Sequence, residues 1–455
     1  MAGSALAGTK SLHIPAAYGK SPNGWTWSRL DDVSEGVFDC PHSTPKLTDT
    51  GPFVVRTQDI ITGVFRADQA GHVSEETYAE RIARVTPCRG DLLYSREGTY
   101  FGIAAEVPAK TRICLGQRMV LIRPDKRRLD FSFLCRWLNS PIMAAHIHGY
   151  RDGTVAERLN LPTIRALPIL IPPLSKQKAI AAVLGSLDDK IELNRRMNAT
   201  LEAMARALFQ SWFVDFDPVR AKLDGRQPIG LDKATAALFP ATFQDSALGP
   251  IPQGWTALCL PDAIEVNPRR TLKAGVLAPY LDMKNPPTQG HSADEVIARE
   301  FSSGTKFQNG DTLLARITPC LENGKTGYVD FLEDGEVGWG STEYIVLAPK
   351  PPLPPQFGYL LARSDALRSH AIQNMTGTSG RQRVPSECFN TFRLAVPPPD
   401  IAHRFDKLTA PLMAKIKANS NQSRTLATLR DTLLPKLLSG EMSVADLESR
   451  MEAIR

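Results

Sequence analysis

The chain has 455 residues, of which 42% are apolar and 22% are charged, and its formal net charge is +6 at pH 7. This length predicts two or three domains rather than one compact core, and the composition excludes a largely disordered chain. The positive charge favours a polyanionic partner without establishing one.

The cysteines and the apolar segments restrict the class of protein further. The seven cysteines are scattered, and neither a CxxC pair nor a Cys/His cluster with the spacing of a zinc site is present. A reduced compartment is the simplest interpretation. Residues 1–20 lack the apolar run of a signal peptide, and no segment approaches the ~20 apolar residues of a membrane helix. We therefore expect a cytoplasmic protein with no metal site and no membrane partner.

The first part of the chain, residues 21–173 after an N-terminal tail, is expected to form a mixed α/β domain. Short alternating runs bounded by Gly, Pro and Asp predict strands at Phe53–Ile60 and Arg118–Ile122. Phe131–Leu138 is predicted to be helical. The run Gly90-Asp91-Leu92-Leu93 is typical of a turn that leads into a strand.

A long helix is predicted next, in residues 174–214, with Ser175 as its N-cap after two prolines. Steps of alternately four and three residues give a mostly apolar series, which is a coiled-coil spacing. Its members are Ile180, Leu184, Leu187, Ile191, Asn194, Asn198, Leu201, Ala205, Leu208 and Trp212.

The second part of the chain follows the same plan. Residues 215–250 are expected to be a linker and residues 251–398 a second mixed domain, with a strand at Tyr344–Ala348. A second long helix is predicted in residues 399–440, with Asp400 as its N-cap, before a C-terminal tail, residues 441–455. The equivalent helical series is Phe405, Thr409, Leu412, Ile416, Asn419, Ser423, Leu426, Arg430, Leu433 and Leu437.

The two parts are related by an internal repeat. The openings Gly24-Trp25-Thr26 and Gly254-Trp255-Thr256 match, and so do Gly90-Asp91-Leu92-Leu93 and Gly310-Asp311-Thr312-Leu313. Arg96 then falls on Arg316. The offset drifts between the two front domains, whereas it stays constant at 225 along the helices, from Ile191 and Ile416 to Leu208 and Leu433. The helices thus match without gaps, while the domains before them differ by insertions.

Polar residues interrupt both helical series at the same place, Asn194 and Asn198 in the first and Asn419 and Ser423 in the second. Such residues fix register, because a slipped pairing would bury an unpaired amide. We expect the helices to pair with each other as an antiparallel coiled coil. The alternative is that this face packs on the chain's own globular domains. A helix of about 38 residues is about 57 Å long, enough to hold two domains a helical turn or more of DNA apart.

The chain resembles the specificity subunit of type I restriction–modification systems over about residues 20–445. Besides the Gly-Trp and Gly-Asp elements, four helical runs carry the resemblance: Ile171-Pro172-Pro173-Leu174-Ser175-Lys176-Gln177-Lys178-Ala179-Ile180, Leu187-Asp188-Asp189-Lys190-Ile191-Glu192-Leu193-Asn194, Leu208-Phe209-Gln210-Ser211-Trp212-Phe213 and Leu433-Leu434-Pro435-Lys436-Leu437-Leu438-Ser439-Gly440-Glu441.

The resemblance implies an α+β fold with a pseudo-twofold internal repeat, in which two mixed α/β target-recognition domains are separated by two long helices. Each domain would read one half of a split, asymmetric site in double-stranded DNA. The helices would set the gap and dock two DNA adenine methyltransferase subunits, and motor-nuclease subunits would complete the complex. S-adenosylmethionine, ATP and Mg are expected on those partners and no cofactor on this chain. The second copy has Asp400-Ile401-Ala402-His403-Arg404 where the first has Ser175-Lys176-Gln177-Lys178-Ala179, so its methyltransferase contact is expected to differ in detail.

Two other classes of function stay open at this stage. A stand-alone enzyme is suggested by Asn285-Pro286-Pro287-Thr288, which looks like an adenine methyltransferase motif but has Thr where a flipped base is commonly stacked on an aromatic ring. Asp262 with Asp282-Met283-Lys284 imitates a nuclease pattern, although Val55-Arg56-Thr57 stands at its place in the first copy. No phosphate-binding GxxxxGK[ST] loop is present. A structural adaptor without sequence preference is the third hypothesis.

Candidate DNA contacts are the loop residues with cationic, amide or hydroxyl side chains, because these contact phosphates and base edges. Arg96 and Arg316 are favoured by their recurrence, and the stretch around Arg381 by its flexible backbone. The candidates are Arg56, Gln58, Arg96, Thr99, Tyr100, Arg118 and Arg151 in the first copy, and Lys284, Arg316, Asn323, Lys325, Arg381, Gln382 and Arg383 in the second.

Overall fold

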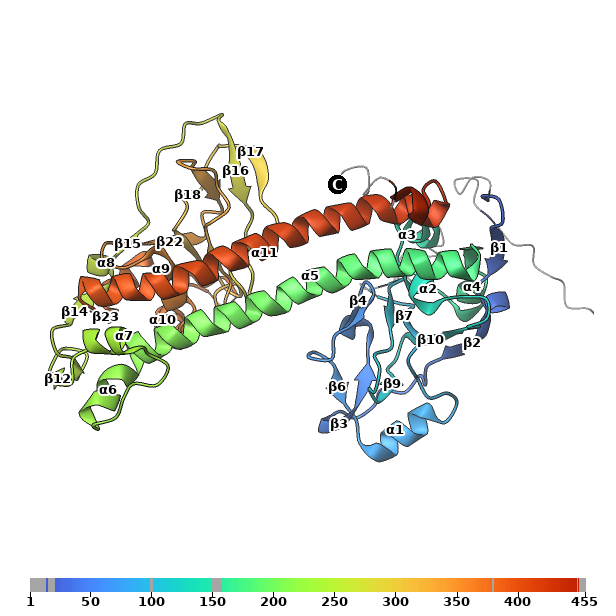
Figure 1. Ribbon diagram of the computed structural model, residues 1–455, viewed down its shortest axis with the longest axis horizontal. Coiled ribbons are helices and arrows are strands. Elements are labelled where there is room, and N and C mark those ends of the chain that lie inside the picture. The colour runs from blue at the N-terminus through green and yellow to red at the C-terminus, as the bar shows by residue number, and fades with distance from the viewer. Residues whose placement is uncertain are drawn as a thin grey trace, which may run out of the picture. The chain divides into compact units, whose positions relative to one another are not determined.

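The computed structural model describes residues 14, 21–98, 101–148, 158–378, 380–447 and 449. They form two compact units: unit 1 extends to Lys190 and resumes at Thr425, and unit 2 is Ile191–Arg424. Helix α5 (Leu174–Phe209) passes from unit 1 into unit 2, and α11 (Pro399–Ser439) passes back, as the chain can be followed in Figure 1. Each unit thus holds one mixed α/β region and parts of both long helices. No described helix is both long enough and apolar enough to cross a membrane.

Unit 1 is built on an antiparallel sheet with the strand order β2-β10-β7-β8, on the three-stranded sheet β6-β3-β9 and on the pairs β1-β11 and β4-β5. The bounds of its elements are β1 Thr26–Arg29, β2 Ser34–Asp39, β3 Thr48–Val55, β4 Ile60–Ile61, β5 Val64–Phe65, β6 Gly71–His72, α1 Glu75–Ile82, β7 Leu92–Ser95, β8 Ala104–Glu106, β9 Ile113–Leu115, β10 Met119–Pro124, α2 Phe131–Leu138, α3 Pro141–His148, α4 Leu161–Arg165 and β11 Pro168–Ile171, with short 3-10 turns at Asp31–Val33 and Thr57–Asp59.

The central strand β7 is buried along its whole length because both faces of its sheet are covered. Leu92 and Tyr94 face a core that includes Phe133 and Trp137 of α2, whereas Leu93 faces a second core on the other side. Alternate side chains of a strand point to opposite faces, so a continuous apolar run serves two cores. Helix α2 has the predicted bounds, and its N-terminus is capped by Asp130, which accepts the Phe133 N–H at 2.9 Å.

Unit 2 contains the sheet β15-β22-β19-β20, the sheet β17-β16-β21-β18 and the pairs β14-β23 and β12-β13. Its elements are α6 Asp217–Leu223, α7 Lys233–Leu238, β12 Phe243–Gln244, β13 Ile251–Pro252, β14 Thr256–Cys259, α8 Leu260–Ala263, β15 Ile264–Val266, β16 Leu277–Leu281, β17 Ile297–Glu300, β18 Thr305–Phe307, β19 Thr312–Ala315, β20 Thr326–Tyr328, β21 Gly338–Gly340, β22 Tyr344–Pro349, α9 Pro355–Ala362, α10 Asp365–Gln373 and β23 Arg393–Val396, with a short π-helix at Gln210–Val214 and a 3-10 helix at Ser386–Asn390.

The matching openings of the two parts have the same local structure. Gly24 and Gly254 have φ angles of +78° and +82°, which favour glycine. The N–H of Trp25 donates to the Pro22 carbonyl at 3.0 Å, and the N–H of Trp255 donates to the Pro252 carbonyl at the same distance. Each turn leads into a strand that pairs with the last strand before a long helix, β1 with β11 and β14 with β23.

The apolar series of the long helices contains no exposed residue in either helix. Towards the outer ends, these residues belong to the cores of the units: Ile180 and Leu437 lie in the core of unit 1, and Ala205 and Phe405 lie in the core of unit 2. The two long helices also bond to each other in the middle, as described below. The alternative of packing on the chain's own domains therefore holds for the outer parts of the series.

Three local predictions need correction. Ser175 and Asp400 are not N-caps, because α5 begins at Leu174 and α11 at Pro399, each directly after a proline. Proline suits the start of a helix, since its φ is fixed and its missing N–H has no helical partner there. The strand expected at Phe53–Ile60 ends at Val55, where a short 3-10 turn follows.

The expected linker, residues 215–250, holds α6, α7 and β12. Phe239 of this stretch lies in the core of unit 2 beside Trp212, with ring centroids 4.9 Å apart. In the C-terminal segment, Met442, Val444 and Leu447 pack against the core of unit 1.

Candidate nucleic-acid interface

The Gly-Asp turn of both units is built around a buried carboxylate. Asp91 and Asp311 are 1% and 2% exposed, and each accepts the backbone N–H three residues before it, from Cys88 and Gln308. An arginine neutralises each carboxylate, but from a different part of the unit. Arg123 of β10 pairs with Asp91 at 2.7 Å, whereas Arg270, after β15, pairs with Asp311 at 2.8 Å.

The two ion pairs shift pKa values in line with their surroundings. The hydrogen bond with Asp91 raises the pKa of Arg123 above its ordinary value. Burial raises the pKa of Asp311, and the hydrogen bonds from Arg270 and from the Gln308 N–H partly oppose this shift. The Asp of the repeated motif is therefore a structural residue that holds the turn before β7 and β19.

The strand after this turn ends in both units at an arginine with the same backbone setting. The N–H of Arg96 donates to the Arg118 carbonyl at 3.1 Å, and the Arg96 carbonyl accepts from Leu159 at 2.8 Å. In unit 2, the N–H of Arg316 donates to the Glu343 carbonyl and its carbonyl accepts from Val384, both at 2.9 Å. The alignment of Arg96 with Arg316 is thus matched by the backbone bonds around each residue.

The side chains of these two arginines differ. Arg96 is 4% exposed, and its Nη1 lies 3.1 Å from the carboxylate of Asp39. Arg316 is partly exposed and forms no ion pair among the described residues, although the buried Nε atoms of both arginines lack a hydrogen-bond partner there. The environment of Arg96 is that of a buried structural ion pair, whereas Arg316 is available to a ligand.

The other described candidates of unit 1 differ in their exposure and in their acidic partners. Arg56 forms a two-bond ion pair with Asp59, at 2.9 and 3.0 Å, which raises the pKa of the guanidinium. Gln58 is exposed beside it. Arg118 is exposed, has a φ of +66° and lies 3.4 Å from Glu97. Three further candidates, Thr99, Tyr100 and Arg151, lie outside the described residues.

In unit 2, the stretch around Arg381 runs beside the segment that follows β19. Arg383 and Ile317 form an isolated antiparallel β-bridge, and the N–H of Thr318 donates to the Gln382 carbonyl at 3.0 Å. The Arg383 guanidinium pairs with Glu343 at 2.7 Å, which raises the pKa of Arg383. Arg381 is exposed, and Gln382 is partly exposed. The fold therefore brings Arg316, Arg381, Gln382 and Arg383 into one neighbourhood.

Lys284, Lys325 and Asn323 form a second neighbourhood in unit 2. The Nζ of Lys325 donates to the carbonyls of Met283 and Lys284, both at 2.9 Å, so this ammonium ties two loops together. Lys284 and Asn323 are exposed. Of these three candidates, Lys325 thus has a structural role in the described structure.

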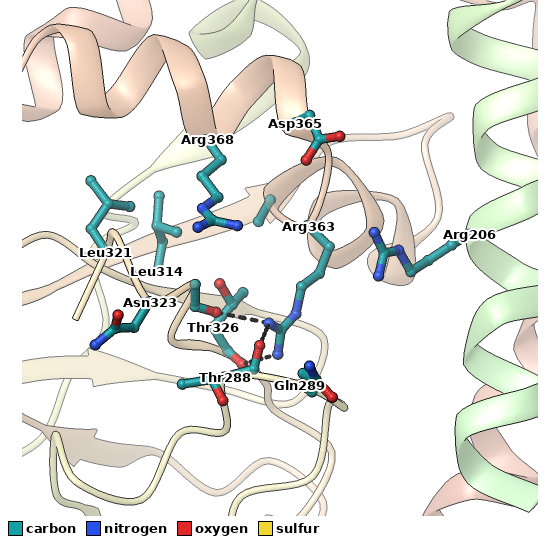
Figure 2. A pocket seen from close by; sticks show the side chains of 12 residues that line it. Arg206, Thr288, Gln289, Leu314, Leu321, Asn323, Thr326, Arg363, Asp365 and Arg368 are labelled. Carbon is teal, nitrogen blue, oxygen red and sulfur yellow. Dashed lines mark hydrogen bonds between the residues drawn. The ribbon is translucent and has the colours of Figure 1, made fainter. Parts of the chain in front are cut away.

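Asn323 also lines a cavity of about 300 Å³ whose cationic residues the sequence reasoning missed. Figure 2 shows Arg363 and Arg368 directed toward the segments that carry Thr288 and Thr326, with Arg206 extending from α5. The Nη1 of Arg363 donates to the carbonyls of Thr288 and Gly324 at 2.7 and 2.8 Å, and its Nη2 donates to Thr326 at 3.0 Å.

Most of this cationic surface is used by the protein itself. The Nε of Arg363 bonds to the Tyr359 hydroxyl, which donates to Glu202 of α5 at 2.7 Å. Glu202 is 8% exposed, so a buried polar chain ties α5 to the loops of unit 2. Arg368 donates to the Glu322 carbonyl. The backbone carbonyls that accept from Arg363 and Arg368 lie far from them in sequence, so no local sequence pattern could have identified these two arginines.

Residues of the motifs that suggested an enzyme form hydrogen bonds that hold local loops. Asn285 is 8% exposed, and its Nδ2 donates to the Glu295 carbonyl at 2.9 Å, so its amide holds a loop. Asp282 accepts the Lys284 N–H at 2.9 Å. Among the described residues, no group of three or more His, Cys, Asp or Glu side chains is placed to hold a metal ion. All seven cysteines are free thiols.

The register residues of the two long helices bond to each other within unit 2. The Nδ2 of Asn194 donates to the Gln422 side chain at 3.0 Å and to Ser423 Oγ at 3.2 Å. The Nδ2 of Asn419 donates to Asn198 Oδ1 at 2.9 Å. As α5 is followed forward from Asn194 to Asn198, its partners move backward along α11, so the helices run antiparallel here.

Comparison with known proteins gives related sequences for most of the chain. Residues 22–203 match the family model described as the type I restriction modification DNA specificity domain. The HindI specificity subunit of Haemophilus influenzae is 24% identical, covering 92% of this chain and 99% of that protein. The MjaIX specificity subunit of Methanocaldococcus jannaschii is 23% identical, covering 94% and 96%.

A solved structure is similar in fold. The S subunit of a type I restriction–modification system from M. genitalium has a TM-score of 0.54, with 16% identity over 92% of this chain and 98% of that one. The mixed α+β fold derived above is therefore found in a protein of the same class as the sequence relatives.

Proposed function

Because the chain belongs to the family of type I restriction–modification specificity subunits, we propose that it reads a bipartite, asymmetric site in double-stranded DNA, one half with each unit. The observation that carries this proposal is the pair Arg96 and Arg316. They have the same backbone bonds after equivalent strands, yet different side-chain surroundings. Two readers with one backbone plan and different surface chemistry suit two different half-sites.

The long helices set the gap between the half-sites in this proposal. Their support is the polar contact of Asn194 with Gln422 and Ser423, which a slip of one helix along the other would break. One added helical turn, about 5.4 Å, would correspond to about one and a half base pairs at ~3.4 Å per step.

The chemistry belongs to partners in this proposal. Two DNA adenine methyltransferase subunits dock on the chain and bind S-adenosylmethionine, and motor-nuclease subunits use ATP and Mg. The chain itself acts in the cytoplasm, where the DNA is, and performs no catalysis. The buried Asn285 supports this assignment, because its amide Nδ2 donates to the Glu295 carbonyl and so holds a loop.

Profiling of adenine methylation in the host genome, with the gene for this chain present and deleted, tests the proposal. We expect one two-part motif with unlike halves to lose its methylation on deletion and to regain it on complementation. An unchanged methylation pattern in the deletion strain would refute the proposed function. Complementation with Asn285→Ala checks the non-catalytic assignment: methylation limited only by the amount of folded chain supports it, and loss of methylation with normal folding opposes it.

A further inference from the structure

Unit 2 has an open pocket of about 330 Å³ whose charged lining residues are all cationic. Lys306 of β18, Arg316 after β19 and Arg270 after β15 supply the charges, and the hydroxyls of Thr305 and Thr342 lie among them. Part of the wall is formed by Tyr344 and Val346 of β22, which are buried at 2% and 0% exposure.

The three cations differ in how far the protein neutralises them. Arg270 is paired with Asp311 at 2.8 Å. Lys306 lies over the ring of Phe301, with its Nζ 4.8 Å from the ring centroid, and no acidic side chain of the described residues forms an ion pair with it. Arg316 forms no ion pair within the described part of the chain and is partly exposed in the pocket lining, and its buried Nε, like that of Arg96, has no hydrogen-bond partner there. A buried, unpaired guanidinium N–H is costly unless a ligand accepts from it.

In unit 1, the arginine at the equivalent position is neutralised by a carboxylate. Asp39, the last residue of β2, pairs with Arg96 at 3.1 Å. In unit 2, strand β15 ends earlier, at Val266, and Asn267 turns the chain away with a φ of +53°. The residues that follow are Pro268, Arg269 and Arg270, so this segment supplies no carboxylate in the place of Asp39, and no described carboxylate forms an ion pair with Arg316.

We propose that this pocket binds a phosphate group of the DNA backbone through Arg316 and Lys306, and that the pair of Arg96 with Asp39 removes this contact from unit 1. Two cations, hydroxyl side chains and an open shape are the features that phosphate contacts use. The inference rests on the proposed function, since it names the part of the DNA that this site takes. A phosphate contact positions unit 2 on the duplex and leaves the reading of bases to other residues.

The test uses the purified full chain and a 40-base-pair duplex of random sequence, with affinity measured as a function of NaCl concentration. Each phosphate contact adds ~0.9 to the slope of log K against log salt. We expect Arg316→Gln to weaken binding roughly tenfold at low salt and to reduce the slope by ~1. Lys306→Gln should reduce the slope similarly. Lys233→Gln, an exposed lysine of α7 outside this pocket, is the charge-matched control and should leave the slope unchanged.

The outcomes separate this inference from the proposed function. A wild-type chain that binds, with an unchanged slope in Arg316→Gln and Lys306→Gln, overturns the inference alone. The same holds if these variants keep their affinity for DNA but lose a protein partner, or if they lose sequence preference without a change in slope. A wild-type chain that binds no duplex overturns the proposed function together with the inference. Unfolding curves should coincide for Arg316→Gln and the wild type, because the guanidinium supports no described contact.

Discussion

Arg96 and Arg316 stand at the same backbone position of two similar sheets, but their side chains have different surroundings. In unit 1 the arginine is buried against Asp39. In unit 2 the neighbouring strand ends early, and the arginine faces an open cationic pocket. This comparison shows that the two units have the same backbone structure in the Gly-Asp turn and in the strand after it. The neighbouring strand then decides whether the cation stabilises the fold or remains available to a ligand.

The largest expected effect concerns what the two units share, the buried Asp of the Gly-Asp turn. Arg123→Gln and Arg270→Gln should each lower the free energy of unfolding of their own unit by about 3 kcal/mol, because an unpaired carboxylate is left buried. Chemical denaturation with a probe in each unit measures this loss. Similar losses would support equal roles for Asp91 and Asp311, and a loss confined to one unit would break the comparison.

The pH dependence of this loss has a defined sign. Burial already raises the pKa of Asp311, and removal of Arg270 raises it further. A carboxyl group whose pKa is raised by folding is favoured in its protonated form, so its contribution to stability is present at low pH and lost as pH rises through the folded pKa. The defect of Arg270→Gln should therefore be smaller at pH 4 than at pH 7. An equal defect at both pH values would contradict the buried-charge explanation.

The next prediction concerns stability, which should depend on Arg96 in unit 1 but not on Arg316 in unit 2. Arg96→Gln should destabilise unit 1 by about 2 kcal/mol, since it leaves the carboxylate of Asp39 without its buried partner. Arg316→Gln should change stability by less than about 0.5 kcal/mol, as expected of a residue without such a partner. Thermal unfolding of both variants under the same conditions checks this contrast. Equal destabilisation by the two substitutions would show that Arg316 is also structural.

The smallest effect concerns the polar contact of the long helices. A double-mutant cycle with Asn198→Ala and Asn419→Ala should give a coupling energy of about 1 kcal/mol, the usual net contribution of one hydrogen bond. Asn421→Ala, at an exposed position of α11, combined with Asn198→Ala serves as the matched control and should give additive effects. Additive effects for Asn198 and Asn419 as well would remove the energetic basis for a fixed register.

The sequence predicted the elements that depend on local pattern. Helix α2, strand β22 and the burial of Asn194 and Asn419 follow from apolar spacing and from the repeat. The sequence did not predict partners that meet only in the folded chain. Arg363 donates to backbone carbonyls of residues that lie 37 to 76 positions away in sequence.

The same limit applies to the candidate site. The repeat aligned Arg96 with Arg316, whose backbone hydrogen bonds match, but the difference between their side-chain surroundings depends on where β2 and β15 end. The N-caps were missed because the prolines before α5 and α11 already start those helices. The DNA contacts of Gln58, Arg381 and the other candidates stay predictions, since the residues around them do not identify a ligand.

Selection of bound duplexes from a random-sequence pool by the full chain tests the central claim, two unlike readers in one molecule, most directly. We expect two short sequence blocks that differ from each other and are separated by a constant gap. Arg381→Ala with Gln382→Ala should relax one block, and Gln58→Ala should relax the other, each by roughly tenfold or more in preference. A single uninterrupted block, two identical blocks, or loss of preference in both blocks from a change in one unit would contradict the account.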